Sequence, residues 1–129
     1  MNGIDDLLVD TNIIIYYLKG ERVAVDFLKK FQSKLSISVI TKMELLSYPY
    51  DEHQDRIIRN FLNTSFHLIN INKDIIEKTI MMRRTKKIKL PDAIIAATAF
   101  VTNLKLVTRN ISDFKNIGIT VIDPFSDHI

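Results

Sequence analysis

The chain has 129 residues, of which 47% are hydrophobic and 26% are charged, as in ordinary soluble globular proteins and unlike disordered or fibrous ones. It has no cysteine, which excludes disulfides and thiolate metal sites, and its formal net charge of +3 permits an anionic partner without requiring one. Polar residues at 10–12 interrupt the apolar run 7–18, so no stretch reaches the roughly 20 residues that span a bilayer. We expect one domain over 1–129 and a cytoplasmic location.

Short apolar runs alternate with longer amphipathic segments along the chain, which is the pattern of an α/β fold. Strands that are separated by helices need crossover connections. We therefore expect a mainly parallel central sheet of about five strands, flanked by helices on both faces. The predicted strands are 7–10, 35–39, 66–72, 104–108 and 119–123.

Apolar residues at helical spacing predict surface helices over 21–34, 52–62 and 73–85. The segment 91–101 is apolar on nearly every side, which predicts a buried helix. Either Ser38 or Thr41 can start a further helix after the second strand. The stretch "IIIYYL" at 13–18 stays ambiguous, because its β-branched isoleucines favour a strand by propensity.

Four acids lie where a predicted strand ends or the next helix begins, which is the edge of a parallel sheet at which ligands bind. Asp10 ends the first strand, and Glu44 lies on the helix that follows the second. Asp92 stands beside Pro91 at the start of the buried helix, and Asp113 follows the strand 104–108. Each acid taken alone can be explained as a helix cap or a turn residue.

Taken together, the four carboxylates point to a shared cation, because several ionised acids brought close together repel one another. All-oxygen ligand sets suit Mg²⁺ or Mn²⁺, bound with water and substrate phosphate. The chemistry that such a site supports is phosphodiester hydrolysis. One metal ion would orient a water for attack, and that ion or a second one, roughly 3.5–4 Å away, would stabilise the leaving oxygen.

The stretch "RRTKKIK" just before Asp92 is dense in basic residues. Such a run can neutralise the phosphates of a nucleic acid backbone. Alternatively it is a solvated helix end, where cations complement the helix dipole. The residues alone leave both interpretations open, and the family resemblance described next favours the first. The candidate RNA-binding residues are Arg83, Arg84, Lys86, Lys87 and Lys89.

Four stretches, "LVDTNIIIYYLKGE", "ITKMELL", "KLPDAIIAATA" and "LVTRNISDF", resemble in order the four acidic motifs of PIN-domain ribonucleases. The resemblance extends over about 7–123 and is greatest to the VapC-type toxins of bacterial type II toxin–antitoxin systems. It implies a helix at 13–18, a homodimer, a cognate antitoxin partner and cleavage of RNA such as tRNA or ribosomal RNA. It also implies a Mg²⁺ or Mn²⁺ site formed by the catalytic residues Asp10, Glu44, Asp92 and Asp113.

Three further residues are assigned to this site as supporting groups by the same resemblance, namely Asn12, Thr108 and Asn110. Asn110 departs from the family pattern, since many relatives carry a further acid at this position. An amide is a poorer ligand for a cation than a carboxylate is.

Two other functions remain open from the sequence. A phospho-receiver signalling domain has a similar length and also binds Mg²⁺ through acids, but it needs a phospho-accepting aspartate after its third strand. Here the run 66–72 is followed by Lys73 and Asp74 without the flanking turn pattern. The second alternative is a PIN-like scaffold that binds RNA without cleaving it, against which the presence of all four acids argues.

Overall fold

The computed structural model describes residues 6–126 of the chain. Its five strands form one sheet in the order β3-β2-β1-β4-β5, and every pair of neighbours is parallel, which confirms the predicted α/β architecture. The strands are shorter than the apolar runs that predict them. They are β1 (Leu7–Val9), β2 (Leu35–Ser38), β3 (His67–Ile69), β4 (Lys105–Val107) and β5 (Val121–Ile122).

Six α-helices and one short 3₁₀ helix connect or follow these strands in the described part of the chain. The prediction for 21–34 was wrong about the last turn, because α2 ends at Lys30 and Ser33 adopts a left-handed φ of 73° that a helix does not tolerate. The helices are α1 (Thr11–Leu18), α2 (Arg22–Lys30), α3 (Val39–Leu46), α4 (Glu52–Ser65), α5 (Lys73–Thr85), α6 (Leu90–Thr102) and η2 (Ile111–Phe114).

The ambiguous segment 13–18 belongs to α1, as the family resemblance implies. Asp10 caps the helix, since its side chain accepts a hydrogen bond from the Thr11 amide at 2.8 Å. Ile13 and Ile14 are fully buried in the same apolar cluster as the sheet residue Val9. Helix propensity differs by only a few tenths of a kcal/mol between isoleucine and good helix formers, whereas burial of each side chain contributes about 1.5–3 kcal/mol, so packing decides the conformation.

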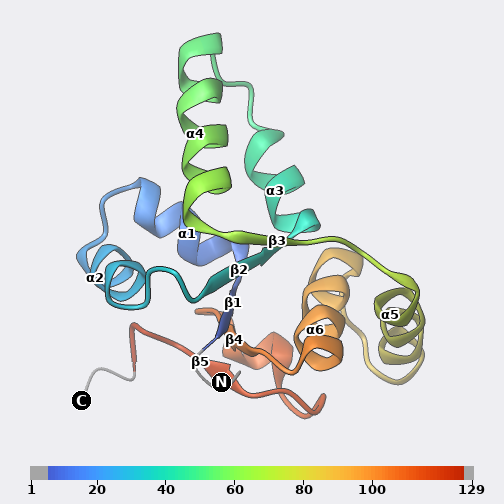
Figure 1. Ribbon diagram of the computed structural model, residues 1–129. Coiled ribbons are helices and arrows are strands. Elements are labelled where there is room, and N and C mark those ends of the chain that lie inside the picture. The colour runs from blue at the N-terminus through green and yellow to red at the C-terminus, as the bar shows by residue number, and fades with distance from the viewer. Residues whose placement is uncertain (1–5, 127–129) are drawn as a thin grey trace.

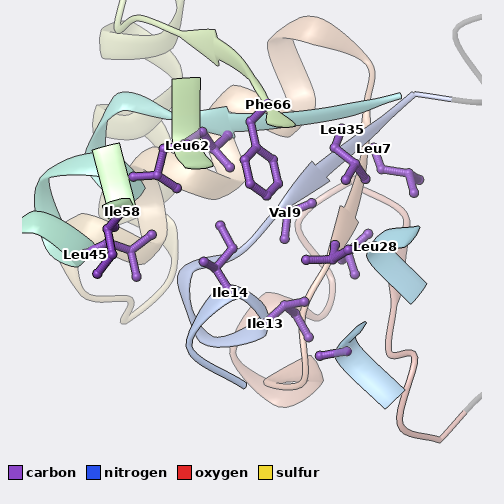
Figure 2. Packing of buried hydrophobic residues seen from close by; sticks show 13 residues of the cluster. Leu7, Val9, Ile13, Ile14, Leu28, Leu35, Leu45, Ile58, Leu62 and Phe66 are labelled. Carbon is purple, nitrogen blue, oxygen red and sulfur yellow. The ribbon is translucent and has the colours of Figure 1, made fainter. Parts of the chain in front are cut away.

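The sheet separates two apolar cores, because successive strand residues point to opposite faces. Leu7 and Val9 pack with residues of α1, α2 and α4 on one face, and Figure 2 shows this cluster closely packed around Val9. Leu8 and Leu106 pack on the other face with residues of α5 and α6. These two helices lie side by side in Figure 1, away from α1 and α2.

The order of the strands creates a switch point beside β1. The chain first adds β2 and β3 on one side of β1, and then returns through α5 and α6 to add β4 and β5 on the other side. In open parallel sheets the crevice for a ligand lies at the carboxyl ends of the two strands where this reversal occurs. Here those strands are β1 and β4, which end directly before Asp10 and Thr108.

Candidate functional site

Asp10 and Thr108 meet at the switch point of the sheet. Thr108 is fully buried and donates a hydrogen bond from its hydroxyl to Asp10 Oδ2 at 2.7 Å. The other carboxylate oxygen, Oδ1, accepts the Thr11 amide, so both oxygens of Asp10 have a donor from the protein. Asp10 is only 5% exposed, and its carboxylate is therefore fixed in position at the base of the site.

The Thr108 hydroxyl is also the acceptor for two neighbouring groups. The backbone amide of Asn110 donates to this hydroxyl at 3.0 Å, and the side-chain Nδ2 of Asn12 donates to it at 3.3 Å. Asn12 Oδ1 accepts the Arg109 amide at 3.4 Å, which ties the loop after β4 to the first turn of α1. The supporting residues predicted from the sequence, Asn12, Thr108 and Asn110, therefore do lie in one network around Asp10.

Glu44 reaches the same edge of the sheet from α3, whose N-cap is Ser38. The Thr11 hydroxyl donates to Glu44 Oε1 at 2.6 Å and lies 2.9 Å from Thr41 Oγ1. Glu44 is exposed, whereas Thr41 is fully buried one turn earlier on α3. Thr11 thus orients the exposed carboxylate from an adjacent helix.

Asp92 stands in the first turn of α6, where Pro91 fits because a proline needs no helical hydrogen-bond donor. No side chain caps this helix, and Lys89 occupies the N-cap position. Asp92 is half-buried, while Ala93 and Ile95 behind it are buried in the core. The apolar helix therefore holds the acid at the mouth of the site.

Asp113 lies in the 3₁₀ helix η2 and is anchored there by the buried Phe114. Its carboxylate accepts a hydrogen bond from Asn110 Nδ2. A carboxylate at position 110 could not donate this bond. Asn110 thus joins Asp113 to the Thr108 network.

The electrostatics show which of the four acids are neighbours. Burial raises the pKa of Asp10 to about 6, despite the donors Thr108 and Thr11, and the negative charges of Asp92 and Glu44 add to this rise. The pKa of Asp92 is also raised, mainly by burial and then by the charges of Asp113 and Glu44, while Lys89 opposes the rise. The four carboxylates therefore share one electrostatic environment, in which Asp92 is linked to Asp10, Asp113 and Glu44.

The side chains do not by themselves form a closed metal cage. Within residues 6–126, no group of three or more histidine, cysteine, aspartate or glutamate side chains is gathered closely enough to enclose a metal ion. Mg²⁺ does not require such a cage, since it is commonly held by one or two carboxylates, several waters and substrate phosphates. Asp10 and Asp92 both have a raised pKa, and the charge of Asp92 adds to the rise at Asp10, so they are the pair whose chemistry fits such an ion.

The basic stretch before Asp92 forms one wall of a pocket beside the acids. Lys87 and Lys89 line it as exposed side chains, together with Asp92, Ser112 and Asp113. Arg83 and Lys86 also line it, whereas Arg84 does not. The structure therefore places four of the five predicted RNA-binding residues next to the acid cluster.

Sequence reasoning missed three residues of this region. Thr11 and Thr41 were not recognised as the groups that hold Glu44, and Arg109, between Thr108 and Asn110, was not considered at all. The spacing of Thr41 one turn before Glu44 was available as a signal. The Thr11–Glu44 bond joins residues 33 positions apart, and only the packing of α1 against α3 creates it.

Comparison with known proteins agrees with this architecture. The PIN domain family model matches residues 7–119. Ribonuclease VapC10 of Mycobacterium tuberculosis is 33% identical over 115 residues, which cover 84% of this chain and 85% of that protein. A chain of a toxin-antitoxin complex from Klebsiella pneumoniae is 42% identical with a TM-score of 0.83, over 92% of this chain and 98% of that one. A chain of DNA-bound VapBC from Salmonella typhimurium has a TM-score of 0.80 at 22% identity, over 92% of this chain and 98% of that one, which shows the fold alone.

A parallel α/β sheet with acids at its switch point and a family match over most of the sequence define the class of protein. The chain belongs to the PIN-domain family. Among its members, the chain is similar to the VapC ribonucleases. This membership removes the phospho-receiver domain as an alternative. Over residues 6–126, no helix is both long and apolar enough to cross a membrane.

Proposed function

We propose that this protein is the endoribonuclease toxin of a type II toxin–antitoxin pair and that it hydrolyses RNA phosphodiester bonds with the help of Mg²⁺ or Mn²⁺. The observation that carries the proposal is the shared environment of Asp10 and Asp92 at the switch point of a PIN fold. Similarity to Ribonuclease VapC10 and to the Klebsiella complex supports both the activity and the partner.

The proposed metal ligands are Asp10 and Asp92, with Glu44 and Asp113 as outer acids that act on the same ion or on its waters. When bound, the ion supplies a positive charge that polarises the scissile phosphate and lowers the pKa of an attacking water. The chain's own residues fix the acids: Thr108 and the Thr11 amide hold Asp10 on both oxygens, and the Thr11 hydroxyl holds Glu44. These bonds keep the carboxylates oriented before substrate arrives.

The basic residues that line the pocket, Arg83, Lys86, Lys87 and Lys89, form a basic wall. This wall would hold the phosphate backbone of the RNA next to the acids. Lys87 and Lys89 line the pocket that also contains Asp92 and Asp113, so a phosphate held by these lysines lies beside the carboxylates. Mutual attraction of lysines and phosphates offsets the repulsion that four acids exert on a polyanion. The reaction class that follows is hydrolysis in a single RNA strand, with tRNA or ribosomal RNA as the candidate substrates.

A cognate antitoxin is the proposed protein partner, because the 42% identical chain belongs to a toxin-antitoxin complex. The homodimer that the resemblance implies remains a prediction, and size-exclusion chromatography with light scattering tests it. A cytoplasmic location belongs to the same proposal, since tRNA and ribosomal RNA are found there.

The decisive experiment compares purified wild-type protein with Asp92→Asn, which keeps the size of the side chain and removes its charge. Wild-type protein should cleave RNA in Mg²⁺, EDTA should stop cleavage, and Asp92→Asn should reduce it by at least about 100-fold, the scale of losing one electrostatic contact to the transition state. Asp26→Asn, the same substitution on the exposed surface of α2, is the control and should cleave normally. Full activity of Asp92→Asn would reject this residue as part of the site.

Expression in bacteria tests the biological role. Induction of the protein alone should arrest growth and produce new RNA 5′ ends at one dominant site, and co-expression of the antitoxin should reverse both effects. Binding of RNA without any cleavage, in vitro and in cells, would instead support the inactive RNA-binding scaffold.

A further inference from the structure

An exposed cation rests on two aromatic rings beside the site. The guanidinium carbon of Arg109 lies 4.2 Å from the centre of the Phe125 ring and 5.2 Å from the centre of the Tyr16 ring. The two rings are themselves 5.1 Å apart and tilted by 56°. Both rings are half-buried in the apolar core on this face of the sheet, and Arg109 is exposed above them. We call these three residues the aromatic–arginine cluster.

The cluster is assembled from three elements at the carboxyl edge of the sheet. Tyr16 lies on the second turn of α1, and Arg109 follows the end of β4. Phe125 lies in the turn after β5, where its amide donates to the buried Asp123 Oδ1 at 2.9 Å. The rings are therefore set on rigid elements, and Arg109 is the only member of the cluster whose side chain is exposed.

The cluster is connected directly to the acids. Arg109 stands between Thr108, which binds Asp10, and Asn110, which binds Asp113. Its amide donates to Asn12 Oδ1 at 3.4 Å. The basic wall lies around the connection between α5 and α6, and these two helices pack on one face of the sheet. Tyr16 lies on α1, whose buried residues pack on the opposite face. A strand of RNA that passes over the acids from the basic wall therefore meets the cluster on the far side.

We infer that the aromatic–arginine cluster is a nucleobase subsite, in which one unpaired base of the RNA stacks on the exposed plane of the Arg109 guanidinium. This inference rests on the proposed ribonuclease function. Single-stranded RNA is recognised by the stacking of splayed bases on aromatic side chains and on guanidinium planes. Tyr16 and Phe125 hold the guanidinium by cation–π attraction, and the Arg109 side chain is exposed, so that a base can reach it from the solvent.

The test is a thermodynamic cycle between the base and the arginine. The full chain carrying Asp92→Asn, which leaves the RNA intact, is titrated with a fluorescein-labelled single-stranded RNA of roughly 12 nucleotides, a usual site size. A set of the same RNA with one abasic ribose at each successive position is titrated in parallel. All titrations are repeated with Arg109→Ala, with Arg109→Lys and with the control Lys30→Ala, which removes an exposed cation that rests on Phe31, the residue that follows α2.

The inference predicts that one abasic position weakens binding by about tenfold in the parent protein, because a stacked base is lost. This penalty should fall below about twofold in Arg109→Ala. It should also fall in Arg109→Lys, since lysine keeps the charge but has no plane on which a base can stack. Lys30→Ala should keep the penalty in full.

Two results would overturn the inference. If the Arg109 variants weaken intact and abasic RNA by the same factor, Arg109 contacts phosphate and not a base. If they lower the melting temperature but keep the abasic penalty, the cluster only connects α1 to the turns after β4 and β5. Failure of the proposed function is a separate outcome, because wild-type protein would then cleave no RNA whatever the effect of the Arg109 variants.

Discussion

At the scale of single residues, Asp10 should make stability depend on pH in an unusual direction. Burial raises its pKa from 3.8 to about 6, so the folded protein binds the proton more tightly than the unfolded chain does. The resulting stabilisation is complete below pH 3.8 and is lost as the pH rises to about 6. A change of about 2 pKa units corresponds to about 3 kcal/mol, since each unit is 1.36 kcal/mol.

Urea denaturation in EDTA at several pH values measures this effect. The Asp10→Asn variant cannot titrate at this position, so its unfolding free energy should gain about 3 kcal/mol relative to the wild type between pH 3 and pH 7. The control is Asp26→Asn, which should leave the size and midpoint of the pH-dependent change as in the wild type. A constant difference between Asp10→Asn and the wild type across this range would show that burial of Asp10 carries no such cost.

At the scale of elements, α1 shows what sequence propensity can and cannot decide. The isoleucines of 13–18 favour a strand by propensity, and only the family resemblance implied a helix. The deciding facts are the Asp10 cap and the complete burial of Ile13 and Ile14 against the sheet. The boundaries of α5, by contrast, follow directly from the sequence, because Asn72 is an N-cap that binds the Ile75 amide at 2.9 Å and the pattern repeats through Thr85.

The basic segment between α5 and α6 contains two kinds of residue, which the sequence could not distinguish. Arg83 Nε donates to the Ile88 carbonyl at 3.1 Å, and Lys86 Nζ donates to the Lys115 carbonyl at 3.2 Å, so both hold the segment in place. Lys87 and Lys89 are exposed in the pocket beside Asp92. We therefore expect these two lysines to make the phosphate contacts.

Replacement of Lys87 and Lys89 by alanine should weaken RNA binding and make it less sensitive to salt. Each phosphate contact on a single strand contributes about 0.7 to the slope of log affinity against log salt, so the slope should fall by about 1.4. Fluorescence anisotropy between low and moderate salt measures it. The control variant, Arg84→Ala with Lys30→Ala, removes the same charge away from this pocket. An equal decrease in slope for both variants would mean that net charge alone matters.

At the scale of the whole molecule, the order of the strands brings the four acids together at one edge of the sheet. The sequence places Asp10 and Asp113 after strands and Asp92 at a helix start, and it predicts a parallel sheet that brings such positions to one edge. It could not predict that β1 and β4 are adjacent, because they are separated by nearly a hundred residues and only tertiary packing pairs them. The Thr108–Asp10 bond and the position of Arg109 above Tyr16 both depend on that pairing.

The arrangement of the acids also predicts how each contributes to binding of Mg²⁺, and melting temperature measures it without any catalysis. Asp10 and Asp92 are partly or fully buried and have a raised pKa, whereas Glu44 and Asp113 are exposed and already hydrogen-bonded by Thr11 and Asn110. At pH 7.5, Mg²⁺ at tenfold its dissociation constant stabilises the folded state by about 1.4 kcal/mol, which raises the melting temperature by roughly 5 °C.

Asp10→Asn and Asp92→Asn should abolish this rise, while Glu44→Gln and Asp113→Asn should retain part of it. Equal rises in Asp92→Asn and wild-type protein would place the ion elsewhere, and equal losses in all four variants would require four direct ligands instead of two.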